Sequence, residues 1–526
     1  MNEQEKNRSL MVGLKLIVGL VFSISLTGIS VAGTLSQHSG KAQCDAFLGR
    51  VFGEAKITKA TFVDAKDDIP EHCLVLGEMP KDLDFEVRMP AEWNGRTVFG
   101  GSGGFAGYIP NVSQYSTFSP DLAQRGYATI ASNFGHNSRI MDANGAFILD
   151  QSWALDDQIL EDYAYKAIPR VMSSAAQILT ARYGESWTDT KVVYEGCSGA
   201  GRQGLLAAQR YPDLFDGIIS RAPALRLIET FLSYQSIRKQ LKKSDAGLTD
   251  AKLQVVSNAI MAKCDVDDGL KDGILGNPGA CDFKVSDLAC RDQQENDSCL
   301  TASQLESVRA FFEPKEIAGG RYGWDGFPLG TEFIHRWPDD GSGARSGGVS
   351  NYLVDGSIRY MVARDPSIDP INLDPAQYTD RIDKLVKMTD ATDPDLTVFK
   401  NRGGKIILWT GLTDSAITAN HVTGYYESVV EKMGGREVVD GFMEYYTSPG
   451  VEHCSGGPGA DKFDLMGPMF EWLEKKTPPS TSTIIATKLS PTEGSTPIER
   501  PLCQYPTYAK YSDGNPRSAE SFKCVE

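Results

Sequence analysis

The chain has 526 residues, of which 41% are hydrophobic and 23% are charged, and its formal net charge at pH 7 is −16. Because this chain is longer than a single hydrophobic core usually supports, we expect two domains, or one domain with a large insertion. The composition is typical of a soluble globular protein. The negative charge argues against nucleic acid and against anionic lipid surfaces as partners, because like charges repel.

The N-terminus has the pattern of a secretory signal peptide. Basic residues precede an apolar run from Leu16 to Leu26, and the small residues Ser30 and Ala32 stand just before Gly33. The pattern predicts a signal peptide over residues 1–32 and a secreted or periplasmic protein. The alternative is an uncleaved membrane anchor. Polar residues interrupt the run and leave it short for a span, so we expect no stable membrane insertion after cleavage.

Ten cysteines are present, and in an exported protein an even number indicates disulfides. No C-x-x-C pair occurs, which argues against a zinc site. Eight of the cysteines fall into neighbouring pairs along the chain, namely Cys44 and Cys73, Cys264 and Cys281, Cys290 and Cys299, and Cys503 and Cys524. Spacing alone leaves the connectivity open.

Short apolar runs alternate with helical spacing in two parts of the chain. The runs read as buried strands are residues 96–99, 127–131, 192–193, 217–220, 405–409 and 443–446. Such alternation is typical of a parallel sheet covered by helices. It breaks over residues 227–396, which are rich in Asp, Gly and Pro. We predict an α/β domain built from residues 33–226 and 397–526, with residues 227–396 forming an inserted lid.

The stretch from Val192 to Arg202 reads as a strand, a tight turn of small residues and a helix from Gly201. This order is typical of a nucleophile elbow, in which a serine hydroxyl is pushed out above the sheet. Ser198 is the candidate nucleophile, although Ala200 stands where the G-x-S-x-G pattern has its second glycine. The alternative is a glycine-rich turn without catalytic function.

A serine nucleophile needs a base that a carboxylate orients, and α/β-hydrolases supply the three in the chain order Ser, Asp, His. Asp414 follows the strand at residues 405–409, and His453 lies in a glycine-rich loop beyond the strand at residues 443–446. His453 combines the required order with the required loop, so it is the candidate base. Of the other histidines, His421 is expected to be a packed or surface residue, and His136 to be buried, although it could also support the site residues. The remaining ones are His38 beyond the signal, His72 beside a predicted disulfide and His335 in the predicted lid.

Two further features lie beside these residues. Cys197 precedes Ser198 and Cys454 follows His453, so a bond between them would tie the nucleophile to the base; the alternative is two unrelated buried cysteines. The glycine cluster at residues 100–104 follows a strand and could leave backbone N–H groups free for an oxyanion hole. A loop without such a role is the alternative.

The run Gly196-Cys197-Ser198, the later Asp414 and the pair His453-Cys454 together resemble the signature of the tannase and feruloyl esterase family. The stretches at residues 453–459 and 500–503 are similar to those of the family's mono(2-hydroxyethyl) terephthalate hydrolase. The resemblance implies an α/β-hydrolase fold with a large inserted lid, and a serine esterase. It also implies the bond between Cys197 and Cys454 and the four neighbouring pairs.

Several roles also follow from this resemblance. It implies Ser198 as nucleophile, His453 as general base and then acid, Asp414 as orienting carboxylate, and the N–H groups of Gly199 and Gly103 as the oxyanion hole. Residues 265–274 offer clustered oxygen atoms, which Ca²⁺ prefers, although an acidic surface turn would look the same. The resemblance implies a structural Ca²⁺ site, with no organic cofactor, and its ligands are Asp265, Asp268, Leu270, Asp272 and Ile274.

Members of this family hydrolyse esters of aromatic acids. Aromatic residues of the inserted segment that could stack on such a ring are Tyr322, Trp324, Phe327, Phe333 and Trp337. Arg345 could bind the free carboxylate of a terephthalate monoester, but the residues around it do not reproduce the grouping that such an enzyme uses. We therefore favour a small feruloyl or galloyl-type ester. The alternatives are terephthalate monoester hydrolysis, amide cleavage, and a catalytically weak binding protein on the same scaffold. The sequence makes no prediction of oligomeric state.

Overall fold

One sheet of eleven strands organises the part of the chain that the structure describes. The structure is a computed structural model that describes residues 40–112, 122–141, 147–184, 189–291, 296–331, 349–489 and 496–526. Gly40–Glu526 forms one compact unit. The predicted signal peptide lies outside the described residues. Among those residues, no helix is both long and apolar enough to cross a membrane.

The strands follow the order β1-β2-β3-β4-β6-β5-β9-β10-β13-β14-β17 across the sheet. Neighbouring strands from β6 to β14 run parallel, whereas β1 to β4 and β17 join antiparallel. Their bounds are β1 Val51–Phe52, β2 Ala55–Val63, β3 His72–Met79, β4 Leu83–Pro90, β5 Arg96–Gly100, β6 Ala128–Ser132, β9 Lys191–Cys197, β10 Gly217–Arg221, β13 Lys405–Gly411, β14 Met443–Ser448 and β17 Cys503–Gln504. Each strand predicted from an apolar run is therefore present.

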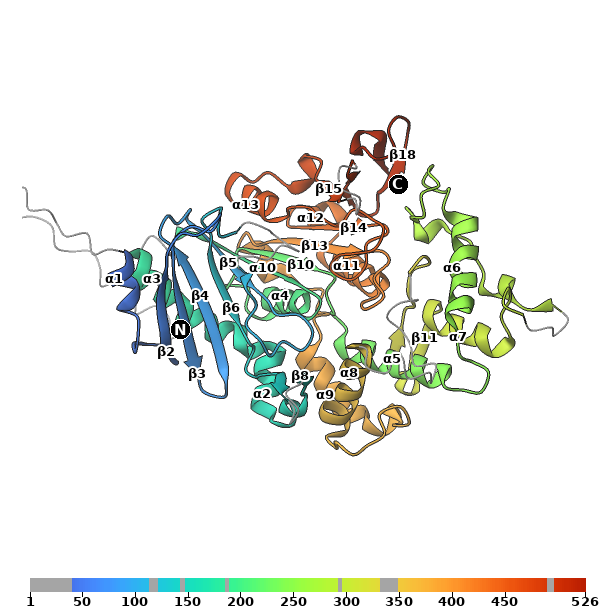
Figure 1. The fold of residues 1–526 in the computed structure, drawn as a ribbon, viewed down its shortest axis with the longest axis horizontal. Coiled ribbons are helices and arrows are strands. Elements are labelled where there is room, and N and C mark those ends of the chain that lie inside the picture. Colours follow the sequence, from blue (N-terminus) through green and yellow to red (C-terminus); the bar gives the residue numbers. More distant parts are fainter. Residues whose placement is uncertain are drawn as a thin grey trace, which may run out of the picture. The chain divides into compact units, whose positions relative to one another are not determined.

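Both faces of the parallel strands are buried, which explains their nearly continuous apolar sequences. Successive side chains point to opposite faces, so Val193 and Tyr194 belong to different core clusters. One face is covered by α3 (Ala167–Tyr183), α4 (Gly199–Arg210) and α11 (Ala419–Met433). The other face is covered by α13 (Met466–Lys475). Figure 1 shows these helices around the strands.

The segment between β10 and β13 interrupts this alternation, as the sequence predicts. Its principal elements are α5 Leu227–Leu241, α6 Asp250–Cys264, α7 Ala302–Phe312, β11 Lys315–Ile317, β12 Tyr322–Trp324, α8 Val349–Gly356 and α9 Thr379–Thr389. We call residues 227–396 the inserted segment; its bounds and its role as a lid remain predictions. Residues 332–348, and with them Phe333, Trp337 and Arg345, lie outside the described residues.

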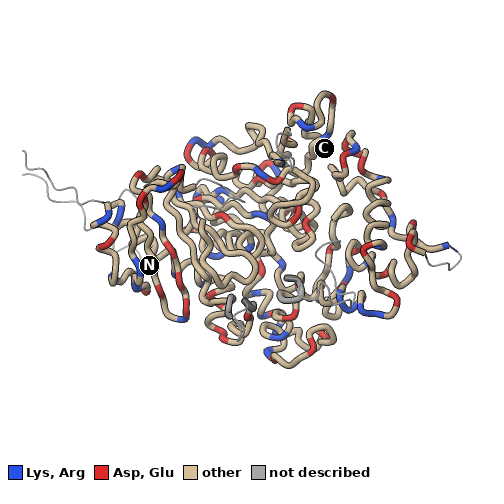
Figure 2. The backbone as a smooth tube through the Cα atoms, viewed as in Figure 1, with Lys and Arg blue, Asp and Glu red and all other residues tan. Residues whose placement is uncertain are grey.

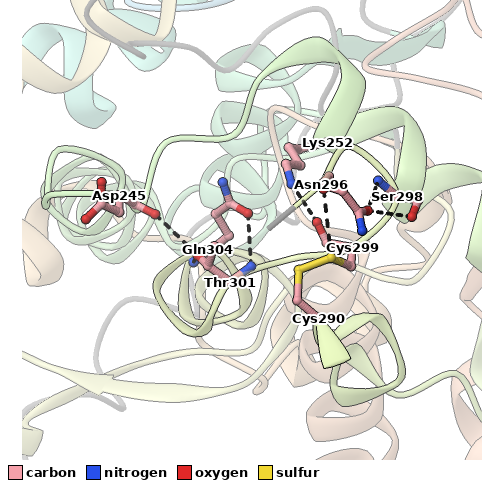
Figure 3. The surroundings of a disulfide bond; sticks show 8 residues. All are labelled: Asp245, Lys252, Cys290, Asn296, Ser298, Cys299, Thr301 and Gln304. Atoms are coloured by element: carbon pink, nitrogen blue, oxygen red, sulfur yellow. Dashed lines mark hydrogen bonds between the residues drawn. A yellow bond between two sulfur atoms is a disulfide. The ribbon is translucent and has the colours of Figure 1, made fainter. Parts of the chain in front are cut away.

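Local polar contacts and a disulfide also hold this segment. Figure 3 shows the disulfide between Cys290 and Cys299 and the ammonium of Lys252, which donates to the carbonyl oxygens of Asn296 and Cys299 at 2.6 Å each. The Thr301 hydroxyl caps α7, and the Gln304 side chain returns a bond to the Thr301 amide. This reciprocal capping box satisfies backbone groups that a helix start leaves unpaired.

The remaining elements are short. They are α1 Gly40–Asp45, α2 Asp157–Glu161, α10 Thr397–Asn401, α12 Arg436–Asp440, β7 Arg139–Met141, β8 Phe147–Leu149, β15 Ile485–Lys488, β16 Ile498–Pro501, β18 Tyr508–Tyr511 and β19 Phe522–Val525. Acidic and basic residues are interspersed along the described backbone (Figure 2). All ten cysteines are paired, as the family resemblance implies: Cys44 with Cys73, Cys197 with Cys454, Cys264 with Cys281, Cys290 with Cys299, and Cys503 with Cys524.

Candidate active site

Ser198 lies at the turn between β9 and α4. Its φ of 66° and ψ of −125° are unusual for a residue with a side chain, and such strain persists only where the surroundings hold it. The Ser198 amide donates to the Arg221 carbonyl at 2.9 Å, and the Ser198 carbonyl accepts from the Ala224 amide at 3.1 Å. Strand β10 and its following turn therefore fix the elbow. Helix α4 begins at Gly199, two residues earlier than the sequence predicts.

Ala200 fits this elbow because two glycines face its methyl group. A Cβ on Gly196 would lie 2.5 Å from the Ala200 Cβ, and one on Gly101 would lie 2.7 Å from it. The Tyr194 hydroxyl also donates to the Ala200 carbonyl at 3.0 Å. The methyl group thus fills space that these glycines leave open, and it does not push the turn apart.

The predicted oxyanion-hole segments lie against each other. A Cβ on Gly199 would lie 2.4 Å from the Gly104 carbonyl oxygen, and one on Gly103 would lie 3.8 Å from the Cys197 carbonyl oxygen. Gly199 is also the first residue of α4, where backbone N–H groups have no partner within the helix. The turn at residues 103–104 is therefore next to the start of α4 and to Ser198.

A buried ion pair lies beneath the elbow, and the sequence analysis missed it. Glu195 in β9 and Arg221 in β10 are 3% and 2% exposed, and Glu195 Oε1 accepts from Arg221 Nε at 3.0 Å and Nη2 at 2.9 Å. The guanidinium also lies 5.0 Å from the ring centroid of Phe463, in the chain beyond His453. Since pairs in adjacent strands are separated by many residues, no local sequence signal marks them.

Asp414 and His453 meet as the sequence predicts. Asp414 Oδ2 lies 2.7 Å from His453 Nδ1, and the Asp414 side chain is completely buried, whereas that of His453 is 15% exposed. Asp414 Oδ1 accepts the backbone amides of Ala416 at 2.8 Å and Ile417 at 2.9 Å. An ionised carboxylate only accepts hydrogen bonds, so the hydrogen of this contact is on His453 Nδ1. In the neutral imidazole the lone pair is then on Nε2.

The loops that carry these two residues are joined along their backbones. The Leu412 amide donates to the Ser448 carbonyl at 2.9 Å, and the Thr413 amide donates to the Val451 carbonyl at 3.1 Å. Gly411 permits this approach, since a Cβ there would lie 2.2 Å from the Val451 carbonyl oxygen. The disulfide between Cys197 and Cys454, with Cα atoms 6.0 Å apart, then brings the His453 loop to the nucleophile elbow.

A family model described as tannase and feruloyl esterase matches residues 71–525. The chain belongs to this family. It is therefore a carboxylic ester hydrolase.

Individual relatives match over most of their length. The mono(2-hydroxyethyl) terephthalate hydrolase of Piscinibacter sakaiensis is 30% identical over 526 residues, which cover 87% of this chain and 85% of that protein. A protein of Arthroderma benhamiae described as a probable feruloyl esterase is 27% identical over 456 residues, or 83% of this chain and 81% of that one. Feruloyl esterase B from Aspergillus oryzae has a structure with a TM-score of 0.78 at 23% identity, covering 93% of this chain and 100% of that chain. This likeness agrees with the sheet in giving the esterase an α/β-hydrolase fold.

The other described histidines of this esterase are buried, with 1% to 6% of their surface exposed. His136 is 2% exposed and stacks on Trp153 at 3.9 Å, and burial lowers its pKa to about 4. Burial lowers the pKa of His421, which packs edge-on against Trp324, to about 3. His72 is 6% exposed beside Cys73. His38 and His335 lie outside the described residues.

The acidic loop at residues 265–274 offers oxygen donors, which suit Ca²⁺. Asp265 and Asp268 are each 5% exposed, and burial raises the pKa of Asp268 to about 6. Asp272 Oδ2 accepts from Arg500 at 2.8 Å. In the described ranges, no three acidic, histidine or cysteine side chains converge closely enough to form a metal-binding group. The donor chemistry therefore fits a hard cation, while the carboxylates are not gathered around one point.

The candidate ring-stacking residues of the inserted segment differ in their surroundings. Trp324 is 1% exposed and its indole N–H donates to the Phe311 carbonyl at 3.3 Å. Phe327 is 2% exposed and packs against Trp324 with ring centroids 5.0 Å apart. Tyr322 is half-buried and its hydroxyl bonds to Asp383. Trp324 and Phe327 are thus core residues of the inserted segment.

Proposed function

We propose that this protein is a secreted serine esterase that cleaves esters of aromatic acids, of feruloyl or galloyl type, through an acyl-enzyme intermediate. The observation that carries the proposal is the 2.7 Å contact between Asp414 and His453, on a loop that a disulfide ties to the residue before Ser198. This arrangement matches what a serine nucleophile needs, which is a base held in one tautomer beside the hydroxyl.

In the first half of the proposed reaction, Ser198 Oγ attacks the ester carbonyl carbon while His453 Nε2 takes the hydroxyl proton. The imidazolium is stabilised by Asp414, whose own position is fixed by two backbone amides. Negative charge on the former carbonyl oxygen is stabilised by the N–H groups of Gly199 and Gly103. Collapse of this intermediate breaks the bond to the alcohol oxygen, which leaves with the proton from His453, and the acid remains esterified to Ser198.

The second half repeats these roles with water. His453 Nε2 takes a proton from a water molecule as its oxygen attacks the acyl carbon. The second tetrahedral intermediate then breaks its bond to Ser198 Oγ, which recovers the proton from His453, and the free carboxylic acid is released. Proton transfer requires hydrogen-bond distance in both halves, so a link that restrains the Ser198 and His453 loops favours both.

The aromatic acid is supported by the family to which the chain belongs and by the relative described as a feruloyl esterase. A second candidate is hydrolysis of mono(2-hydroxyethyl) terephthalate, which is favoured by the relative of that name at 30% identity. In that reading, Arg345 binds the free carboxylate of the substrate.

Turnover of a small panel tests the proposal. The purified mature protein is given methyl ferulate, methyl gallate, mono(2-hydroxyethyl) terephthalate and the amide of ferulic acid, each beside Ser198→Ala. We expect ester cleavage that is lost in Ser198→Ala, and no amide cleavage. Equal turnover by Ser198→Ala would contradict the mechanism, and preference for the terephthalate ester would favour the second candidate. A folded protein that leaves every ester intact would favour the binding-protein reading.

Two further proposals concern the protein around the site. We propose that residues 1–32 are removed on export, which N-terminal sequencing of the mature protein tests by a start at Gly33. We also propose a structural Ca²⁺ held by Asp265, Asp268 and Asp272 with the carbonyls of Leu270 and Ile274. Calcium removal by a chelator should then lower the melting temperature, calcium alone should restore it, and Asp268→Asn should no longer respond. An unchanged melting temperature would contradict this site.

A further inference from the structure

We propose that Tyr234 of the inserted segment is a positioning residue for Asp414, the orienting carboxylate, and acts through the peptide group between Ala416 and Ile417. This inference rests on the proposed roles of Ser198, Asp414 and His453. Tyr234 lies in α5, 182 residues before the loop that it contacts.

One peptide group connects the tyrosine to the carboxylate. The Tyr234 hydroxyl donates to the carbonyl oxygen of Ala416. The N–H of the same planar peptide group belongs to Ile417, and it donates to Asp414 Oδ1 at 2.9 Å. Rotation of this peptide plane would break both bonds together. A hydrogen bond from Tyr234 therefore fixes the direction of the N–H that holds Asp414.

The chain of bonds ends at the base. Asp414 Oδ2 contacts His453 Nδ1 at 2.7 Å, so the sequence of contacts is Tyr234 hydroxyl, peptide group, carboxylate and imidazole. Hydrogen bonds in such a chain polarise one another in a low-dielectric interior. Burial, followed by the charge of Asp414, raises the pKa of Tyr234 well above its usual range, so the hydroxyl keeps the proton that it donates.

The ring of Tyr234 is held in place by the inserted segment. It packs edge-on against Trp324 with centroids 6.0 Å apart and stacks on Phe327 at 6.4 Å. The chain just after Asp414 contacts the inserted segment beside Phe327, since the Thr418 hydroxyl donates to the Gly326 carbonyl at 2.5 Å and Asn420 Nδ2 donates to it at 3.0 Å. The bonds of Thr418 and Asn420 join the inserted segment to the chain after Asp414. The bond from Tyr234 differs from them because it acts on the peptide group that holds the Asp414 carboxylate.

The test compares Tyr234→Phe with Tyr425→Phe. Each change removes one hydroxyl from a buried ring. Tyr425 lies in α11, and its hydroxyl donates to the Asp393 carbonyl at 3.2 Å, so it is outside the chain of bonds to Asp414. We expect kcat for the best ester to fall about tenfold in Tyr234→Phe with KM unchanged within about twofold, which corresponds to about 1.4 kcal/mol of activation free energy. Tyr425→Phe should keep the kcat of the unmodified protein. Each variant is assayed at the same interval below its own melting temperature.

A spectroscopic readout separates positioning from general loosening. The proton that His453 Nδ1 shares with Asp414 is expected as a low-field signal in the proton NMR spectrum, and it should move or broaden in Tyr234→Phe alone. An equal fall of kcat in both variants, or an unmoved signal with unchanged kcat in Tyr234→Phe, would overturn the inference. If Tyr234→Phe does not fold, Tyr234 is replaced by 3-fluorotyrosine, which keeps the ring and the hydroxyl but is a stronger hydrogen-bond donor. The signal should then move, and an unmoved signal would overturn the inference. Activity that survives in Ser198→Ala would instead overturn the proposed function on which the inference rests.

Discussion

The nucleophile and the orienting carboxylate of this site are held in different ways. Ser198 lies on a turn between β9 and α4, and its backbone bonds reach the end of β10, within 26 residues along the chain. Asp414 is held by amides of its own loop, and that loop is contacted by Tyr234 and Gly326 of the inserted segment. The position of the nucleophile therefore depends on the sheet, whereas that of Asp414 also depends on the inserted segment.

His453 belongs to both regions. The disulfide between Cys197 and Cys454 ties it to the nucleophile, and its hydrogen bond ties it to Asp414. Because proton transfer needs all three side chains at hydrogen-bond distance, a change in the nucleophile elbow or in the contacts of the Asp414 loop should lower kcat. The size of the fall should report how directly each contact acts on the triad.

The largest effect is expected for Asp414→Asn. The asparagine oxygen can accept the amides of Ala416 and Ile417, which leaves its NH₂ group facing His453 and favours the wrong imidazole tautomer. We expect kcat to fall about 10⁴-fold, the magnitude known for this change in another serine hydrolase. Asp464→Asn, in a partly exposed pair with Arg125, is the control and should keep its activity. A loss below about tenfold in Asp414→Asn would show that Asp414 does not orient His453.

Removal of the linking disulfide should come next. The double variant Cys197→Ala with Cys454→Ala loses a disulfide that closes a loop of 257 residues. The control, Cys290→Ala with Cys299→Ala, loses a disulfide that closes a loop of only 9 residues. Chain-entropy arguments give about 5.5 kcal/mol for the long closure and about 2.5 kcal/mol for the short one in free energy of unfolding. The kcat of the first variant should fall on the order of tenfold to a hundredfold, since small misplacements of reacting groups are costly. Equal kcat in the two variants would mean that the link does not position His453.

A smaller effect on kcat is expected from a change where the loop of Asp414 contacts the loop of His453. In Gly411→Ala the new methyl group would lie 2.2 Å from the Val451 carbonyl oxygen, so the loops must separate. We expect a loss of about 1–3 kcal/mol in free energy of unfolding and a lower kcat. The control is Gly424→Ala, in α11, where nothing lies within 4 Å of the new methyl group. It should gain about 0.5–1 kcal/mol without a change in kcat; a stable and fully active Gly411→Ala would contradict the tight approach.

Ala200→Gly should have the smallest effect. The methyl group fits against Gly101 and Gly196, so its removal should change kcat by less than about twofold and destabilise α4 by about 1 kcal/mol. Kinetics and thermal melting of the purified variant check this. A several-fold rise in kcat would instead mean that Ala200 crowds the elbow.

The sequence predicts the parts of this protein that rest on short-range patterns. The strands that end near Ser198, Asp414 and His453 follow from apolar runs, and the elbow follows from small residues after a β-branched pair. The contacts of Tyr234 with Ala416 and of Glu195 with Arg221 could not be predicted, because they join separate elements. A buried tyrosine in a helix has the same local pattern whether it fills a core or orients a catalytic loop.

The roles of some glycines can be predicted from the sequence, whereas those of others depend on contacts that only the fold creates. The glycine-rich stretch after His453 is visible in the sequence, and it indicates a tight loop. That Gly411 must lack a side chain depends on the Val451 carbonyl, which the fold brings against it. The effect of Ala200 likewise depends on Gly101, which lies on another strand end.

Covalent trapping of the nucleophile tests the central claim most directly. The mature protein is treated with a fluorophosphonate, which reacts with activated serine hydroxyls, and its peptides are analysed by mass spectrometry. We predict one adduct, on Ser198, that forms in the unmodified protein and is lost in His453→Gln. An adduct on a different serine, or labelling of Ser198 that does not depend on His453, would contradict the proposed triad.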